Sequence, residues 1–198
     1  MNIFAAMDKI SVKDIYGRMK VFLTHPEKMW RHALQERHPA KEMYRNYLFP
    51  IAMATSMLVL LLGLVHHDLL TSLGLAAINL LSTTGGSWIA YLIIKEYVCG
   101  KLGYKEHHAL NLTIYSAAIF IVFHSIGAVL DNMFVGQLFI LFSFIFIRTL
   151  YKGLDALSGL QTAQKTNALI IGSLSIICLP IIFTQILTIV FGVSAFNV

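Results

Sequence analysis

Four polar side chains interrupt long apolar runs of this sequence at similar depths. Each lies four to six residues from one end of its run, so four helices would place them in one layer roughly 6–9 Å below a common surface. One interpretation is a site for a ligand, a proton or an ion, because such groups are costly inside a membrane and often functional. The other is hydrogen bonding between helices, which contributes about 0.6 kcal/mol per contact. The four residues are Asn79, His124, Gln137 and Gln185.

A second group with possible chemistry is the hydroxyl and glycine run at 82–87, which falls in the middle of an apolar run. Gly85 and Gly86 could unwind a helix there and expose carbonyl groups, as transporters do at substrate sites. Ser82 and Gly86 also form a pair of small residues four apart, a spacing that lets two helices approach closely. The sequence favours close packing, and Pro180 predicts a kink in the last apolar run.

A metal site is a weaker hypothesis. His66, His67 and Asp68 follow the first apolar run, and Asp131 lies in a turn that would reach the same surface. Adjacent histidines on a helix point about 100° apart, so a neighbouring pair rarely binds one ion unaided. The alternative is that these are exposed residues at a membrane surface.

The motifs of common enzyme classes are absent from the sequence. It contains no G-x-S-x-G element, no P-loop and no H-E-x-x-H pair, and no paired carboxylates lie within an apolar run. We therefore expect no enzymatic activity and no cofactor.

The elements that must position these residues are transmembrane helices. The chain is 57% hydrophobic and only 13% charged, whereas soluble domains are about 25% charged. An α-helix needs about 20 apolar residues to cross a bilayer, and the two-residue connection at 131–132 requires an antiparallel helical hairpin. We predict an all-α, polytopic membrane domain over residues 47–198. Its five spans are expected at about 47–66, 73–97, 109–130, 133–150 and 167–191.

The distribution of lysine and arginine predicts the orientation. The connections at 67–72 and 131–132 contain none of these residues, whereas the other two connections and their flanks contain three each. Positive connections face the cytoplasm. The amino terminus is therefore expected inside and the carboxyl terminus outside.

Residues 1–46 form a basic segment that contains nine of the 15 lysine and arginine residues. Its pattern predicts short amphipathic helices on the membrane surface, attracted to anionic lipid headgroups rather than to nucleic acid. The apolar face and the neighbouring basic residues could form a surface for a partner or for lipid. The alternative is a helix that only lies on the bilayer. The candidate surface residues are Arg18, Lys20, Phe22 and Trp30.

Several short segments occur in a recognisable order along the chain. They are Pro26-Glu27-Lys28-Met29-Trp30, Pro50, Gly63, Gly100-Lys101-Leu102-Gly103-Tyr104, Tyr115-Ser116 and Tyr151-Lys152-Gly153-Leu154. On these segments the sequence, from about Phe22 to Phe191, resembles the Yip domain family, the Ypt/Rab-interacting proteins and their bacterial relatives. The resemblance implies five spans after a cytoplasmic amino-terminal segment and a membrane-organising role, and it supplies no catalytic residues.

Two functions remain open at this point. The first is a non-enzymatic, bacterial-type member of that family, in the inner membrane of its cell, which organises other membrane components through a protein partner or a second copy of itself. The second is a small transporter or channel built on the polar layer and on the Gly85-Gly86 pair. A bound small molecule would favour the second function, and a stoichiometric partner protein would favour the first.

Overall fold

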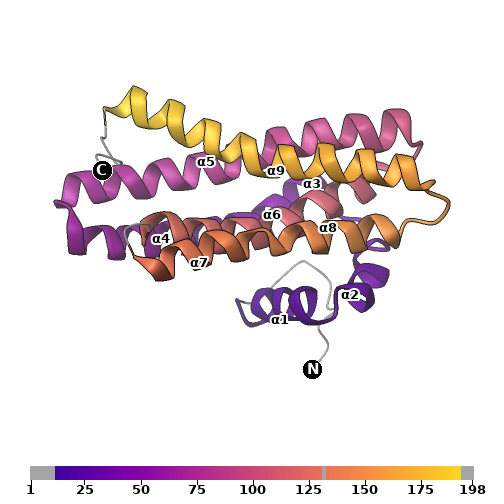
Figure 1. Cartoon of the computed structure of the whole chain (residues 1–198), viewed down its shortest axis with the longest axis horizontal. Helices are drawn as coiled ribbons and strands as arrows, with labels where there is room; N and C mark the ends of the chain where they lie inside the picture. Colours follow the sequence, from indigo (N-terminus) through magenta and orange to yellow (C-terminus); the bar gives the residue numbers. More distant parts are fainter. Residues whose placement is uncertain (1–11, 131–132, 193–198) are drawn as a thin grey trace.

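The structure is a computed structural model that describes residues 12–130 and 133–192, and this part of the chain is helical without any strand (Figure 1). In chain order the elements are α1 (Val12–Thr24), α2 (Pro26–Ala33), α3 (Ala40–Met43), the π-helical turn η2 (Tyr44–Leu48), α4 (Phe49–His66), α5 (Leu69–Lys95), the π-helical turn η3 (Glu96–Lys101), α6 (Glu106–Val129), α7 (Phe134–Ser143), α8 (Ile145–Asp155) and α9 (Thr162–Phe191).

Five continuous or nearly continuous helical segments in the described residues are long and apolar enough to cross a membrane, as predicted. They are longer than the apolar runs alone indicated, because helix continues into the polar flanks. We name the two ends of the bundle after residues in their connections. The His67 end is where α4 meets α5, and the Lys101 end is where η3 leads into α6. The five segments are Ala40–His66, Leu69–Lys101, Glu106–Val129, Phe134–Asp155 and Thr162–Phe191.

The predicted boundary between residues 46 and 47 falls inside the first of these segments. Helix begins at Ala40 and continues through η2 into α4. The described amino-terminal residues also share one hydrophobic core with the bundle. The two parts are therefore packed together, and the chain does not change from surface helix to membrane span at residue 47.

The start of α5 is fixed by Asp68 at the His67 end. The Asp68 carboxylate accepts hydrogen bonds from the Thr71 hydroxyl at 2.6 Å and from the amides of Leu70 and Thr71 at 3.1 and 3.2 Å. The bonds from Thr71 are the main reason that the pKa of Asp68 is lowered. A charged cap stabilises the positive end of a helix, so α5 begins four residues before the predicted position.

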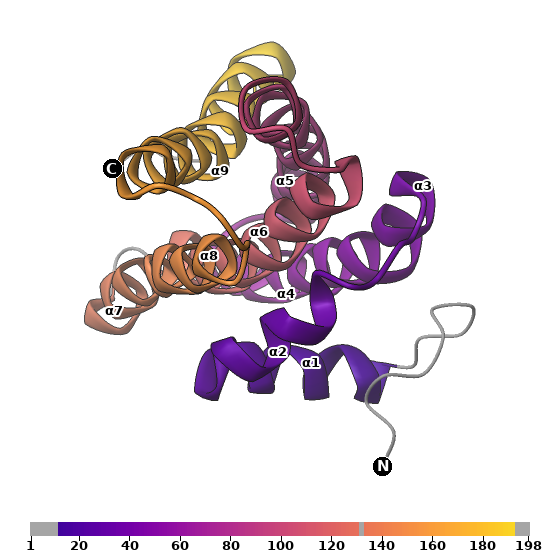
Figure 2. The ribbon, with the colours of Figure 1, turned by 90° about the vertical axis from the view of Figure 1, so that its right-hand side faces the viewer.

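Helix α6 is the centre of the bundle and the most buried of the five membrane-length helices. It packs against α4, α5, α7, α8 and α9. Figure 2 shows α5 and α9 on one side of it and α4 and α8 flanking it, with α1 and α2 forming a further layer beneath.

The segment predicted as one span at 133–150 consists of two helices. Helix α7 ends at Ser143 and α8 begins at Ile145, with Phe144 joining them. The predicted turn at Asp131 and Asn132 lies outside the described residues. Close to it, Gly127 of α6 packs against Ile140 and Gly136 of α7, which brings the two helices together.

Helices α5 and α9 pack through the glycine pair. A Cβ atom on Gly86 would lie 2.6 Å from the backbone nitrogen of Pro180, so the two backbones are in direct contact. Helix α5 continues without interruption from Leu69 to Lys95. The alternative that Gly85 and Gly86 unwind the helix is therefore wrong, and the prediction of close packing is confirmed.

We expect Gly86→Ala to destabilise the protein by about 1–3 kcal/mol, because the new methyl group would push α5 away from the backbone of α9. Gly85→Ala is the matched control. Its methyl group would meet only the Phe183 ring, at 3.3 Å, and a ring can rotate aside. Thermal unfolding in mild detergent measures both variants. Equal melting temperatures for the two would contradict the packing role of Gly86.

Candidate functional site

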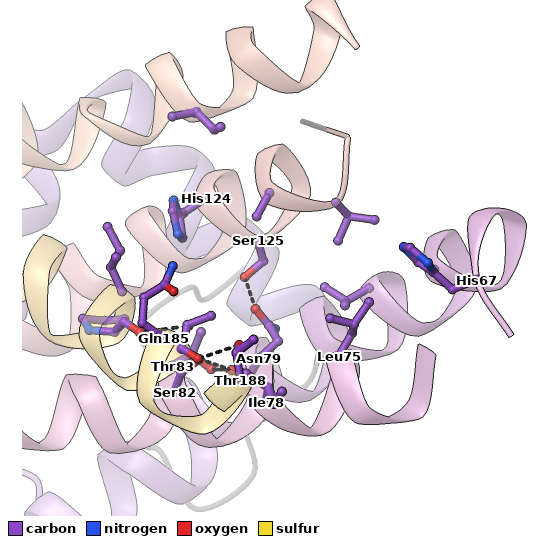
Figure 3. A pocket seen from close by; sticks show the side chains of 18 of the residues that line it. His67, Leu75, Ile78, Asn79, Ser82, Thr83, His124, Ser125, Gln185 and Thr188 are labelled. Carbon is purple, nitrogen blue, oxygen red and sulfur yellow. Dashed lines mark hydrogen bonds between the residues drawn. The ribbon is translucent and has the colours of Figure 1, made fainter. Parts of the chain in front are cut away.

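A cavity of about 510 Å³ lies toward the His67 end, between α4, α5, α6 and α9 (Figure 3). Its walls combine aliphatic side chains with uncharged polar ones. The polar lining residues are His66, His67, Asn79, Ser82, Thr83, His124, Ser125, Thr184, Gln185 and Thr188.

Three of the four residues predicted to form a polar layer line this cavity, namely Asn79, His124 and Gln185. Gln137 does not line the cavity, so the prediction that it belongs to the same polar layer was wrong. Gly136, the residue before it, is buried against Gly127 of α6, and successive helical residues point about 100° apart. Gln137 is therefore turned outward and is exposed.

Asn79 connects three helices. Its Nδ2 donates to Ser56 Oγ of α4 at 2.9 Å, and its Oδ1 accepts from Ser125 Oγ of α6 at 2.9 Å. Both ends of the amide are therefore occupied by protein groups. Asn79 therefore fits the interpretation of hydrogen bonding between helices, and not that of ligand binding.

His124 and Gln185 are arranged differently. His124 stacks on Phe120, with ring centroids 4.8 Å apart and 12° between the planes. Figure 3 shows the Gln185 amide extending from α9 toward the His124 ring. Among the described residues, neither side chain has a hydrogen-bond partner. Both are therefore available to a molecule inside the cavity.

Two lining threonines on α9 were missed by the sequence analysis. Thr184 Oγ1 donates to the carbonyl of Pro180 at 2.9 Å, and Thr188 Oγ1 donates to the carbonyl of Thr184 at 2.7 Å. The sequence spacing could have identified them, because residues 180, 184 and 188 are four apart and share one face of a helix. Their hydroxyl hydrogens are used locally, so each of these threonines can offer a ligand only an acceptor.

His66 and His67 also line the cavity, at its outer rim. The described residues contain no group of three or more histidine, cysteine, aspartate or glutamate side chains placed to hold a metal ion. Asp68 caps α5 instead, and Asp131 lies outside the described residues. Nothing in the described part of the chain therefore assembles the metal site that the sequence suggested.

Most of the residues predicted to form a partner surface are buried inside the protein. Arg18, Phe22 and Trp30 are at most 2% exposed, so a surface built on them is wrong, and only Lys20 is exposed. The Trp30 indole donates to the carbonyl of Thr149 in α8 at 2.7 Å. Its ring occupies space left by Gly153, where a Cβ atom would lie 2.8 Å from the ring. The apolar face of α1 and α2 thus packs on α6 and α8 instead of on lipid.

Arg18 fixes this packing through polar contacts. Its Nη1 donates to Glu36 Oε1 at 2.9 Å and to the Tyr115 hydroxyl at 2.7 Å, and that hydroxyl donates to Glu36 Oε2 at 2.6 Å. Burial opposes the positive charge, but Tyr115 and Glu36 outweigh it and raise the pKa of Arg18. Asn111 completes the contact by donating to the carbonyls of Ala33 and Glu36.

No family model, curated protein or solved structure shows significant similarity to the chain. The resemblance to the Yip domain family therefore stays a prediction that rests on the short segments quoted above. The number of membrane-length helices in the described residues is compatible with it. In the first of those segments Pro26, Met29 and Trp30 are buried, whereas Glu27 and Lys28 are exposed.

We expect Arg18→Ala to destabilise the docked position of α1 and α2. Removing one partner of a buried ion pair typically costs about 3–5 kcal/mol, and the lower end applies here because Glu36 is 15% exposed. Limited proteolysis should then cleave within residues 12–39 much faster than in the wild type. Lys20→Ala, on the exposed face of the same helix, is the control. Equal cleavage rates in both variants would show that the ion pair does not hold the segment.

Proposed function

We propose that this chain is a non-enzymatic, multi-pass membrane protein that binds a small molecule in the cavity between α4, α5, α6 and α9, as a small transporter or carrier would. The observation that carries the proposal is the pair His124 and Gln185, two polar side chains without described protein partners that project into the same cavity. Polar groups inside a membrane protein are costly, so unpaired ones are expected to have a function.

The volume and lining indicate the kind of ligand. A cavity of about 510 Å³ falls within the roughly 300–1,000 Å³ that small-molecule sites occupy. Among the described lining residues there is no lysine, arginine, aspartate or glutamate. The site therefore suits an uncharged or amphipathic molecule, which would receive hydrogen bonds from the imidazole and the amide.

Two irregular positions on helices that line the cavity support a carrier role. Pro180, which lines the cavity, lies within α9 and removes a backbone donor there, and Phe144 separates α7 from α8. Membrane spans that contain a proline or an interruption are typical of transporters, in which one part of the bundle moves against another. Under the predicted orientation, the His67 end faces the outside of the cell.

A membrane-organising role of the Yip type is the second candidate. The observation that favours it is the exposed basic side of α1 and α2, with Lys20, Lys28 and Arg31 opposite the buried apolar face. This side would fit anionic headgroups or an acidic partner, and in a bacterium the protein would lie in the inner membrane. The docked helices would then present a fixed surface.

The binding proposal is tested by native mass spectrometry of the protein purified from its own host in mild detergent. We expect an additional bound mass, and we expect its occupancy to fall severalfold in Gln185→Leu and in His124→Ala, because each loses a hydrogen bond worth about 0.5–1.5 kcal/mol. Gln137→Leu is the matched control, since this glutamine is exposed and lies outside the cavity. An unliganded wild type, or equal loss in all three variants, would refute the proposal.

A further inference from the structure

The cavity opens sideways. Gln185 lines the cavity and is nevertheless exposed, so the wall on the α9 side is incomplete. Ile140 is the residue of α7 that lines the cavity. Figures 1 and 2 both show α7 and α9 well apart toward the His67 end. Because Ile140 of α7 and the exposed Gln185 of α9 both line the cavity, we place the opening between these two helices.

The opening follows from how α9 is held. Near Pro180 the backbone of α9 touches Gly86 of α5, and Phe183 lies against Gly85. These contacts keep the last part of α9 beside α5, on the opposite side of the cavity from α7. Phe144 divides α7 from α8, and of these two helices α8 is the one that packs against α9.

The outward sides of α7 and α9 are apolar. On α9, Ile186 and Ile189 are 52% and 80% exposed, and on α7, Leu141 and Phe142 are 62% and 45% exposed. Side chains of this kind on membrane-length helices face the hydrocarbon of the bilayer, where water is excluded. A molecule that enters between α7 and α9 therefore comes from the membrane and not from water.

The interior suits a hydrocarbon chain with few polar atoms. Leu75, Ile78 and Ile181 contribute aliphatic surface. The hydroxyls of Thr184 and Thr188 already donate to the carbonyls of their own helix. Apart from the exposed His66 and His67, the lining side chains left to donate to a ligand are His124 and Gln185, and two such donors match the oxygen atoms of an ester.

We infer that the ligand is a membrane phospholipid, one acyl chain of which enters the cavity between α7 and α9. Its ester oxygens accept hydrogen bonds from His124 and Gln185, and its headgroup lies near His66 and His67 at the rim. This inference rests on the proposed function and names the class of molecule that the cavity binds.

The test uses the full chain reconstituted in vesicles of phosphatidylcholine, part of which carries a diazirine midway along one acyl chain. After irradiation, mass spectrometry maps the labelled residues. We expect label on cavity residues of α6 and α9, including Ala128 and Ile181, in addition to the outward residues that any annular lipid reaches.

Two tryptophan substitutions on α9 form a matched pair. Thr184→Trp fills the cavity and should reduce label at Ala128 about tenfold, whereas Ile186→Trp faces the bilayer at the same depth and should leave it unchanged. Size-exclusion chromatography checks that each variant folds. Ala128→Leu, followed through label at Ile181, replaces Thr184→Trp if that variant does not fold.

Label confined to outward residues, with the same pattern in every variant, would overturn the lipid inference. If the purified protein then still carried a bound mass that Gln185→Leu removes, the ligand would be a water-soluble molecule and the proposed function would stand. If the purified protein carried no such mass, the proposed function would fail together with the inference.

Discussion

The contact between Gly86 and Pro180 determines how the rest of the bundle is arranged. It joins the backbones of α5 and α9 in the middle of the membrane-length segments, where a single added carbon atom would lie 2.6 Å from a backbone nitrogen. Small residues allow such an approach, and van der Waals packing then holds the helices without the hydrophobic effect that operates in water. Because α9 is held against α5, it is not free to cover α6 on the side of α7. The cavity is the space that remains.

The amino-terminal helices show how a polar pair can organise an apolar interface. Phe22, Trp30 and Tyr115 pack around one another, with ring centroids 4.6–6.0 Å apart. Such aromatic contacts stabilise the docking, but many rotations of the two helices would bury the same rings. Arg18 and Glu36 select one of them, because their hydrogen bonds to the Tyr115 hydroxyl require one geometry. The ion pair therefore contributes specificity in addition to stability.

The sequence predicted the number of membrane-length helices because hydropathy over about 20 residues is a strong signal. It did not distinguish a surface that faces lipid from one that faces protein, since both are apolar in a membrane protein. Trp30 illustrates this limit: its place in an amphipathic pattern was recognised, but its burial against α8 depends on Gly153, far along the chain. Gln137 and Gln185 illustrate a second limit. Depth along a helix follows from counting residues, whereas the direction of each side chain depends on which neighbour the helix meets.

The contacts of the first helices also constrain how the protein is made. Arg18 requires Tyr115, and Trp30 requires Thr149, so the segment synthesised first has no complete docking site until the chain has reached α8. At about 5–20 residues per second, synthesis leaves Phe22 and Trp30 uncovered for several seconds or more. During that interval their apolar face matches the membrane surface. An amphipathic segment that first lies on the bilayer and later moves onto the bundle would couple the completion of α8 to the burial of α1 and α2.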